Sequence, residues 1–150
     1  MKISVTSHSV YKIRYHMVFQ VKYRRVLFSP QIENYVKYLM KGIQERYNLV
    51  IEEIGFDQNH VHIFIGAPPT KSPMDIYTII KSVTARQIFV RFPWLKIYEL
   101  WGGEFWSDGK YVGTVGEETT ATTIRKYIQH QGLDRENYTN RLRQLKLFKL

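Results

Sequence analysis

The chain has 150 residues, 44% of them hydrophobic, and contains no cysteine. Disulfides, zinc–thiolate sites and cysteine nucleophiles are therefore excluded, and the length predicts a single domain with a real core. The 22 Lys and Arg residues outnumber 13 Asp and Glu, and this +9 charge favours a polyanionic partner, most often a nucleic acid. An aromatic content of 15% also suits a surface that stacks bases.

The chain shows no targeting or membrane segment by composition. Residues 1–10 are polar and lack the apolar centre of a signal peptide. No apolar run approaches the length that spans a bilayer, so we expect no membrane partner and a cytoplasmic location.

Residues 11–24 alternate between apolar and polar positions, which predicts one half-buried strand. Its polar face is cationic, and no acidic residue precedes Glu33. The side chains on this face, which include one histidine, are Lys12, Arg14, His16, Val18, Gln20, Lys22 and Arg24. We expect Lys12, Arg14, Lys22, Arg24 and Arg25 to contact phosphates, with a solvated strand end as the alternative.

A helix is predicted after Ser29, which can cap it, with Pro30 in the first turn. Its buried positions recur at helical spacing at Ile32, Val36, Leu39, Met40, Ile43 and Tyr47. Residues 49–56 then predict a strand, residues 57–59 a turn, and residues 60–65 a second strand stopped by Gly66. We expect these two strands to form an antiparallel hairpin.

The second strand of this hairpin carries a pair of histidines. Val61, Ile63 and Ile65 share the face expected in the core, so His60, His62 and Phe64 share the other. Two imidazoles two residues apart on a strand start about 6–7 Å from each other and can reach one divalent ion. The alternative is that these histidines only form local hydrogen bonds.

A second helix is predicted after Ser72, which can form a capping box with Asp75. Ile76, Ile80 and Val83 form its buried stripe, Lys81 and Arg86 lie elsewhere on its surface, and it ends before Phe92-Pro93. Residues 94–101 are expected to form a loop. Residues 105–115 are expected to form a strand, with a hairpin about Asp108-Gly109 as one option.

A third helix is predicted from about Glu117 to Gln131, stopped by Gly132, and residues 133–150 form a basic helix or tail. Tyr127 and Gln131 are four residues apart and therefore share one helical face. If that face meets the histidines, a phenol and an amide oxygen lie beside the metal position.

The order of these elements predicts an α+β fold of the ferredoxin-like (RRM-like) split βαβ plan, with an added C-terminal helix that carries Tyr127. The chain would be one domain over residues 1–150, with a core at about 10–132. In this plan the first and third strands are neighbours, which brings His16 towards His60 and His62.

These residues resemble the HUH single-tyrosine transposases of small insertion sequences, the TnpA family. The resemblance covers about residues 10–132, and its segments follow in chain order. They are Tyr15-His16 with Phe19, residues 22–24, Asn59-His60-Val61-His62, residues 81–86, residues 114–116, and Tyr127-Ile128 with Gln131. Two departures are Ser82, where a glycine is common, and a long 105–115 segment.

The resemblance implies cleavage and rejoining of single-stranded DNA by Tyr127 through a 5′-phosphotyrosine intermediate. It also implies a Mg²⁺ or Mn²⁺ ion held by His60, His62 and Gln131. The substrates would be hairpins at the element's ends, and the protein would be a homodimer. Since the covalent intermediate stores the energy of the phosphodiester, no nucleotide cofactor is needed.

Lys81 and Arg86 join the basic residues expected to hold DNA, and Tyr23 and Trp106 are candidates for base stacking. Within enzymes, the alternatives are a nickase of the replication or conjugation type, a domesticated repeat-associated transposase, and an RNA endonuclease with a histidine base. From another class, a non-catalytic single-stranded nucleic-acid-binding module would explain the charge and the aromatic residues. It would leave His60, His62, Tyr127 and Gln131 without a joint purpose.

Overall fold

The computed structural model describes residues 4–5, 10–115 and 126 of the chain. The predicted third helix with Tyr127 and Gln131, and the segment 133–150, lie outside the described residues apart from Lys126, which is helical.

Four antiparallel strands form the central sheet in the order β4-β5-β3-β6. Their bounds are β3 Arg14–Gln20, β4 Val50–Phe56, β5 His60–Gly66 and β6 Tyr111–Thr114. The first and third strands of the sheet, β3 and β5, are neighbours, as the ferredoxin-like plan requires. A separate two-stranded ladder joins β1 Ser4–Val5 to β2 Val10–Tyr11. The predicted α+β class is therefore confirmed.

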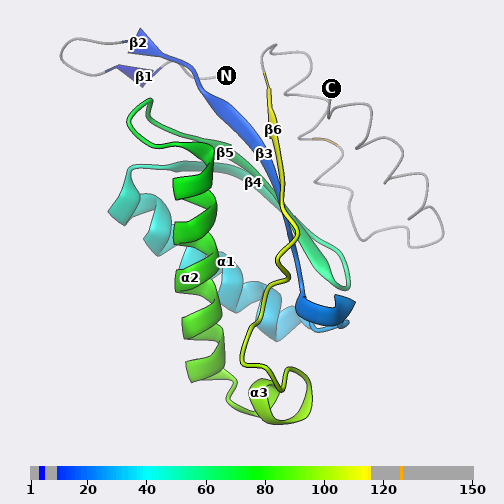
Figure 1. The fold of residues 1–150 in the computed structure, drawn as a ribbon. Helices are drawn as coiled ribbons and strands as arrows, with labels where there is room; N and C mark the ends of the chain where they lie inside the picture. Colours follow the sequence, from blue (N-terminus) through cyan, green and yellow to red (C-terminus); the bar gives the residue numbers. More distant parts are fainter. Residues whose placement is uncertain (1–3, 6–9, 116–125, 127–150) are drawn as a thin grey trace.

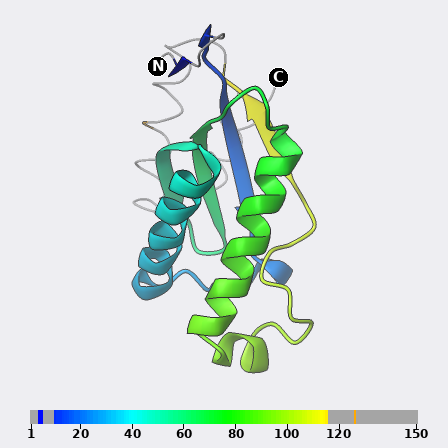
Figure 2. The ribbon, with the colours of Figure 1, turned by 90° about the vertical axis from the view of Figure 1, so that its left-hand side faces the viewer.

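Two long helices, α1 Pro30–Tyr47 and α2 Pro73–Arg91, cover one face of the sheet (Figures 1 and 2). Both begin where the sequence predicted. The Ser29 side chain accepts a hydrogen bond from Ile32 N, and Ser72 and Asp75 form a reciprocal capping box. Because these caps satisfy amide groups that have no partner inside the helix, they fix where each helix starts.

The hydrophobic core lies between the sheet and these helices. Met17, Phe19 and Val21 reach it from β3 and its end, and Val61, Ile63 and Ile65 reach it from β5. The helices contribute Ile32, Val36, Met40, Ile43, Ile76, Tyr77, Ile80 and Ile88. Because this apolar set occupies the odd positions of β5, the histidines at its even positions lie on the sheet face away from the helices.

The predicted strand over residues 11–24 is too long. Only Arg14–Gln20 form β3, and Lys22–Arg24 form a short 3₁₀ helix, η1, with Tyr23 and Arg24 at φ 59° and 54°. Lys22 N donates to Phe105 O, a partner distant in sequence that replaces the ladder at this point. Tyr23, a candidate for base stacking, is 57% exposed.

The segment after α2 also differs from expectation. Residues 94–98 form a short helix, α3 Trp94–Tyr98, where a loop was expected. Residues 105–110 do not form a strand or a hairpin about Asp108-Gly109; only Trp106 bridges to Val21 before β6 begins. The Tyr77 hydroxyl donates to Gly109 O, and this contact with α2 holds the segment away from a hairpin turn.

No helix in the described part of the chain combines the length and apolar character needed to cross a bilayer.

Candidate active site on the sheet face away from the helices

His60 and His62 lie on β5, beside β3, which carries His16. In the antiparallel register, His62 is opposite Val18 and His16 is opposite Phe64, so the two histidines are diagonal neighbours. The predicted approach of His16 is therefore observed. His16 Nε2 lies 3.0 Å from His62 Nδ1, and the two rings stack with centroids 5.2 Å apart. The rings of His60 and His62 lie 4.9 Å apart at 69°.

Each ring of the histidine pair is held through its Nδ1 atom. His60 Nδ1 lies 2.8 Å from Asn59 Oδ1, which accepts a hydrogen bond from it. His62 Nδ1 contacts His16 Nε2, which accepts when the proton of His62 is on Nδ1. The Asn59 contact fixes the tautomer of His60 whose lone pair is on Nε2, and the His16 contact is compatible with the same tautomer of His62, so both Nε2 atoms can bind a metal. The donor set therefore fits a divalent cation.

The surroundings keep His16 and His62 neutral. Burial lowers the pKa of His16 from 6.5 to about 4. Burial also lowers the pKa of His62 well below its ordinary value, and the neighbouring His16 and His60 lower it further. Because a charged imidazole has no lone pair for a metal, these shifts preserve the ligand form at neutral pH.

The described residues do not form a complete metal site. Over residues 4–5, 10–115 and 126, no three His, Asp or Glu side chains are placed to hold one ion together. The predicted third ligand, Gln131, and the predicted nucleophile, Tyr127, lie outside this part of the chain. The pairing of His60 with His62 is observed, and the completion of the site stays a prediction.

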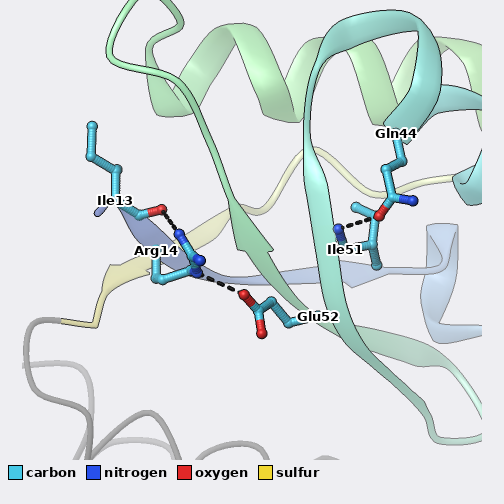
Figure 3. Close-up of polar contacts among 5 residues, drawn as sticks. All are labelled: Ile13, Arg14, Gln44, Ile51 and Glu52. Atoms are coloured by element: carbon cyan, nitrogen blue, oxygen red, sulfur yellow. Dashed lines mark hydrogen bonds and ion pairs between the residues drawn. The ribbon is translucent and has the colours of Figure 1, made fainter. Parts of the chain in front are cut away.

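Arg14 occupies a position that does not favour the predicted phosphate contact. Its side chain is only 1% exposed, and its Nε atom donates to Glu52 Oε1 at 2.8 Å (Figure 3). A β-bulge between Ile51 and Glu53 makes Glu52 an extra residue in β4, and its carboxylate reaches across to Arg14. Gly66 leaves room for the guanidinium, since a Cβ there would lie 2.8 Å from Arg14 Nη1.

The other predicted DNA-binding residues fall in separate places. Lys12 and Arg24 are exposed. Lys22 Nζ lies 2.8 Å from Glu104 Oε2, and this hydrogen bond is the main reason that the pKa of Lys22 is raised. Lys81 lies 3.9 Å from Asp108, and Arg86 lines a groove between α1 and α2 in the helical layer. The set therefore does not form one patch around the histidines.

Trp106 is not available for base stacking. Its side chain is 2% exposed in the core, and its indole nitrogen donates to Thr84 Oγ1 at 2.8 Å. Sequence reasoning missed the role of Asn59, although its place just before His60 at the end of the turn was a usable signal. It also missed Trp101, which is 68% exposed and lies under the guanidinium of Arg25 at 5.2 Å.

Comparison with known proteins decides the family. Residues 9–131 match the family described as IS200-like transposase. The chain belongs to this family of single-tyrosine transposases. It is 33% identical over 122 residues to the ISDra2 transposase TnpA of Deinococcus radiodurans, covering 81% of this chain and 86% of that protein. It is 31% identical over 125 residues to the IS200 transposase of Salmonella typhimurium, covering 83% of this chain and 80% of that protein.

Solved structures agree with this assignment. A Deinococcus radiodurans protein described as a transposase superposes with a TM-score of 0.69 at 29% identity, covering 86% of this chain and 98% of that one. A REP-associated tyrosine transposase bound to a REP hairpin superposes with a TM-score of 0.59, covering 84% and 72%. At 10% identity the second comparison concerns the fold alone. As an IS200-like transposase, the protein is an enzyme that cleaves and rejoins DNA.

Proposed function

We propose that this IS200-like transposase cuts and rejoins single-stranded DNA at the ends of an insertion sequence, with Tyr127 as its nucleophile. The observation that carries the proposal is the buried His60–His62 pair, in which each Nδ1 atom has a polar contact, both Nε2 atoms can bind a cation, and the pKa of His62 is lowered by burial. A binding module would gain nothing from desolvating this pair.

Tyr127 would attack the phosphorus atom through its phenolic oxygen. The new bond joins that oxygen to phosphorus, and the bond from phosphorus to the 3′ oxygen breaks. The 3′ oxygen becomes a hydroxyl by gaining a proton that balances the one lost by the phenol, directly or through water. The resulting 5′-phosphotyrosine keeps the energy of the broken ester, so a second 3′ hydroxyl rejoins the strand without a nucleotide cofactor.

His60 and His62 would hold Mg²⁺ or Mn²⁺ together with Gln131. When bound, such an ion polarises a non-bridging phosphate oxygen and orients the scissile bond. The protein's own part is to keep His62 neutral and to orient the two rings through Asn59 and His16.

The substrate we propose is a hairpin at each end of the element. The REP-associated relative bound to a hairpin supports this choice by its similar fold. Lys12, Lys22, Arg24, Arg25, Lys81 and Arg86 are proposed to contact the backbone, which would make the affinity fall steeply with salt. We also propose a homodimer, with the Tyr127 helix able to complete the partner's site. A complex with DNA that contains only one 17.9 kDa protein chain would contradict this.

The experiment is to incubate the protein and Mn²⁺ with single-stranded DNA from the element's end and to look for an adduct that survives denaturation. Tyr127→Phe should remove the adduct and keep binding, while His62→Ala should remove it by loss of the metal. A binding module would give no adduct in any form. A nuclease with a histidine base would cut in EDTA and ignore Tyr127→Phe.

A further inference from the structure

Two exposed aromatic residues lie on adjoining segments at the end of β3. Tyr23 in η1 is 57% exposed, and Trp101 after α3 is 68% exposed. The two segments are in contact, because Lys22 N donates to Phe105 O and the Tyr23 hydroxyl lies within 3.6 Å of the position a Cβ would take on Gly102. Two large exposed aromatic residues on adjoining segments form a candidate ligand surface, unlike residues that are scattered singly.

Cations border both rings. The Arg25 guanidinium lies over Trp101 at 5.2 Å, and Lys22 Nζ lies over Tyr23 at 5.7 Å. Lys22 is paired with Glu104, whereas Arg24 and Arg25 have no acidic side chain within 4 Å in the described part of the chain. Aromatic faces bordered by guanidinium groups suit a ligand that is both anionic and planar.

The backbone under this surface is strained. Tyr23 and Arg24 both have positive φ, at 59° and 54°, which is uncommon for bulky residues. Such a conformation persists only when the surroundings impose it, and it concentrates at functional sites. Here the bonds from Lys22 N to Phe105 O and from Arg24 N to Val21 O impose it, and they turn the Tyr23 ring out of the core into solvent.

The surface lies close to the histidine site along the sheet. Gln20, the last residue of β3, is paired with His60, and Val21 N donates to Asn59 O. Tyr23 follows only three residues later, a span of at most about 10 Å along the chain. A strand whose phosphate lies at His60 can therefore reach these rings with its neighbouring nucleotides.

We propose that Tyr23 and Trp101 form a stacking platform for unpaired bases next to the cleaved phosphate. Bases inside a duplex have both faces covered by their neighbours, so exposed rings select single strands. Arg24 and Arg25 supply the charge that holds the intervening phosphates. This inference rests on the proposed action on single-stranded DNA and adds a subsite to it.

The test compares two probes of equal length: an oligothymidine strand and the same backbone made entirely of abasic sites. Fluorescence anisotropy measures the affinity of the full-length protein for each. Trp101→Leu should weaken oligothymidine binding by about tenfold, the usual effect of losing one stacked base. It should leave the affinity for the abasic strand unchanged, since the phosphate contacts remain.

Tyr23→Gly is the second variant, because glycine accepts a φ of 59° and the change removes the ring without adding strain. It should show the same selective loss. The control is Tyr38→Ala, which removes a ring that is 70% exposed on α1, in the helical layer, and should change neither affinity.

Equal losses for both probes, no loss for either, or a matching loss in the Tyr38 variant would overturn the platform. If the two rings instead bind a protein partner, neither probe should lose affinity. The adduct assay on the unmodified protein separates this failure from failure of the proposed function. An adduct with no selective loss rejects the platform alone, whereas absence of the adduct rejects the cutting activity.

Discussion

At the scale of single residues, His16 is a positioning residue for the proposed metal ligand His62. Its Nε2 atom is 3.0 Å from His62 Nδ1, and its own Nδ1 has no hydrogen-bond partner in the described part of the chain. Side chains that hold a ligating histidine typically change metal affinity 10- to 100-fold when removed. His16→Phe should therefore weaken Mn²⁺ binding by about 10- to 100-fold, as measured by the electron paramagnetic resonance signal of free Mn²⁺.

The control for this prediction is His16→Gln, whose side-chain oxygen can accept the same proton from His62 and should restore much of the affinity. Nitrogen chemical shifts of the imidazoles give a second reading without metal. If His16→Phe keeps both the His62 tautomer and the Mn²⁺ affinity, His16 only fills space.

The same burial makes stability depend on pH in the metal-free protein. The pKa of His16 falls from 6.5 to about 4 on folding, so between these values the unfolded chain binds a proton that the folded chain refuses. Above about pH 6.5 His16 is neutral in both states and the free energy of unfolding is at its full value. As the pH falls from 6.5 towards 4, protonation of His16 in the unfolded chain lowers that free energy. We expect a loss of about 3 kcal/mol in the free energy of unfolding from this residue.

Urea unfolding at a series of pH values, in EDTA, measures this loss. His16→Phe should flatten the profile, since one titrating group has gone, and the remaining slope belongs largely to His62. A stability that is constant from pH 6.5 to pH 4 in the unmodified protein would show that the histidines are solvated in solution.

At the scale of elements, the caps fix where the helices begin and hence which residues they present. Ser72 Oγ accepts from Asp75 N at 3.0 Å, and Ser72 N donates to Asp75 Oδ2 at 3.2 Å. Ser72→Ala removes the first bond and should cost about 1 kcal/mol. Thermal or urea unfolding measures it. The matched control is Ser82→Ala on the same helix, whose hydroxyl bonds back to the carbonyls of Thr78 and Ile79 and which should be neutral or stabilising.

Elements with local causes were predictable from the sequence, and those with distant causes were not. The caps, the histidine hairpin and the faces of β5 follow from residues within a few positions of one another. The end of β3 depends on Phe105 O, and the burial of Arg14 depends on Glu52, 38 residues away. A pattern of alternation carries no information about such partners.

At the scale of the whole molecule, the strand order predicted a contact between distant residues that local sequence patterns do not reveal. Placing the first and third strands side by side predicted the meeting of His16 with His62, two residues 46 positions apart. Trp106 shows the limit of that reasoning: a buried Thr84 hydroxyl on α2 accepts its indole proton, and nothing near Trp106 in sequence announces this. The residues predicted to contact DNA were inferred chiefly from charge, and the structure distributes them over both layers.

The central claim is that the phenol of Tyr127 and the cation held by His60 and His62 act on one phosphate. The most direct measurement is to digest the covalent protein–DNA adduct and locate the nucleotide by mass spectrometry. The account predicts that it is attached to Tyr127, and that neither His60→Ala nor His62→Ala protein yields it. Attachment to any other residue, such as Tyr111 beside His16, or an adduct that persists without the histidines, would contradict the account.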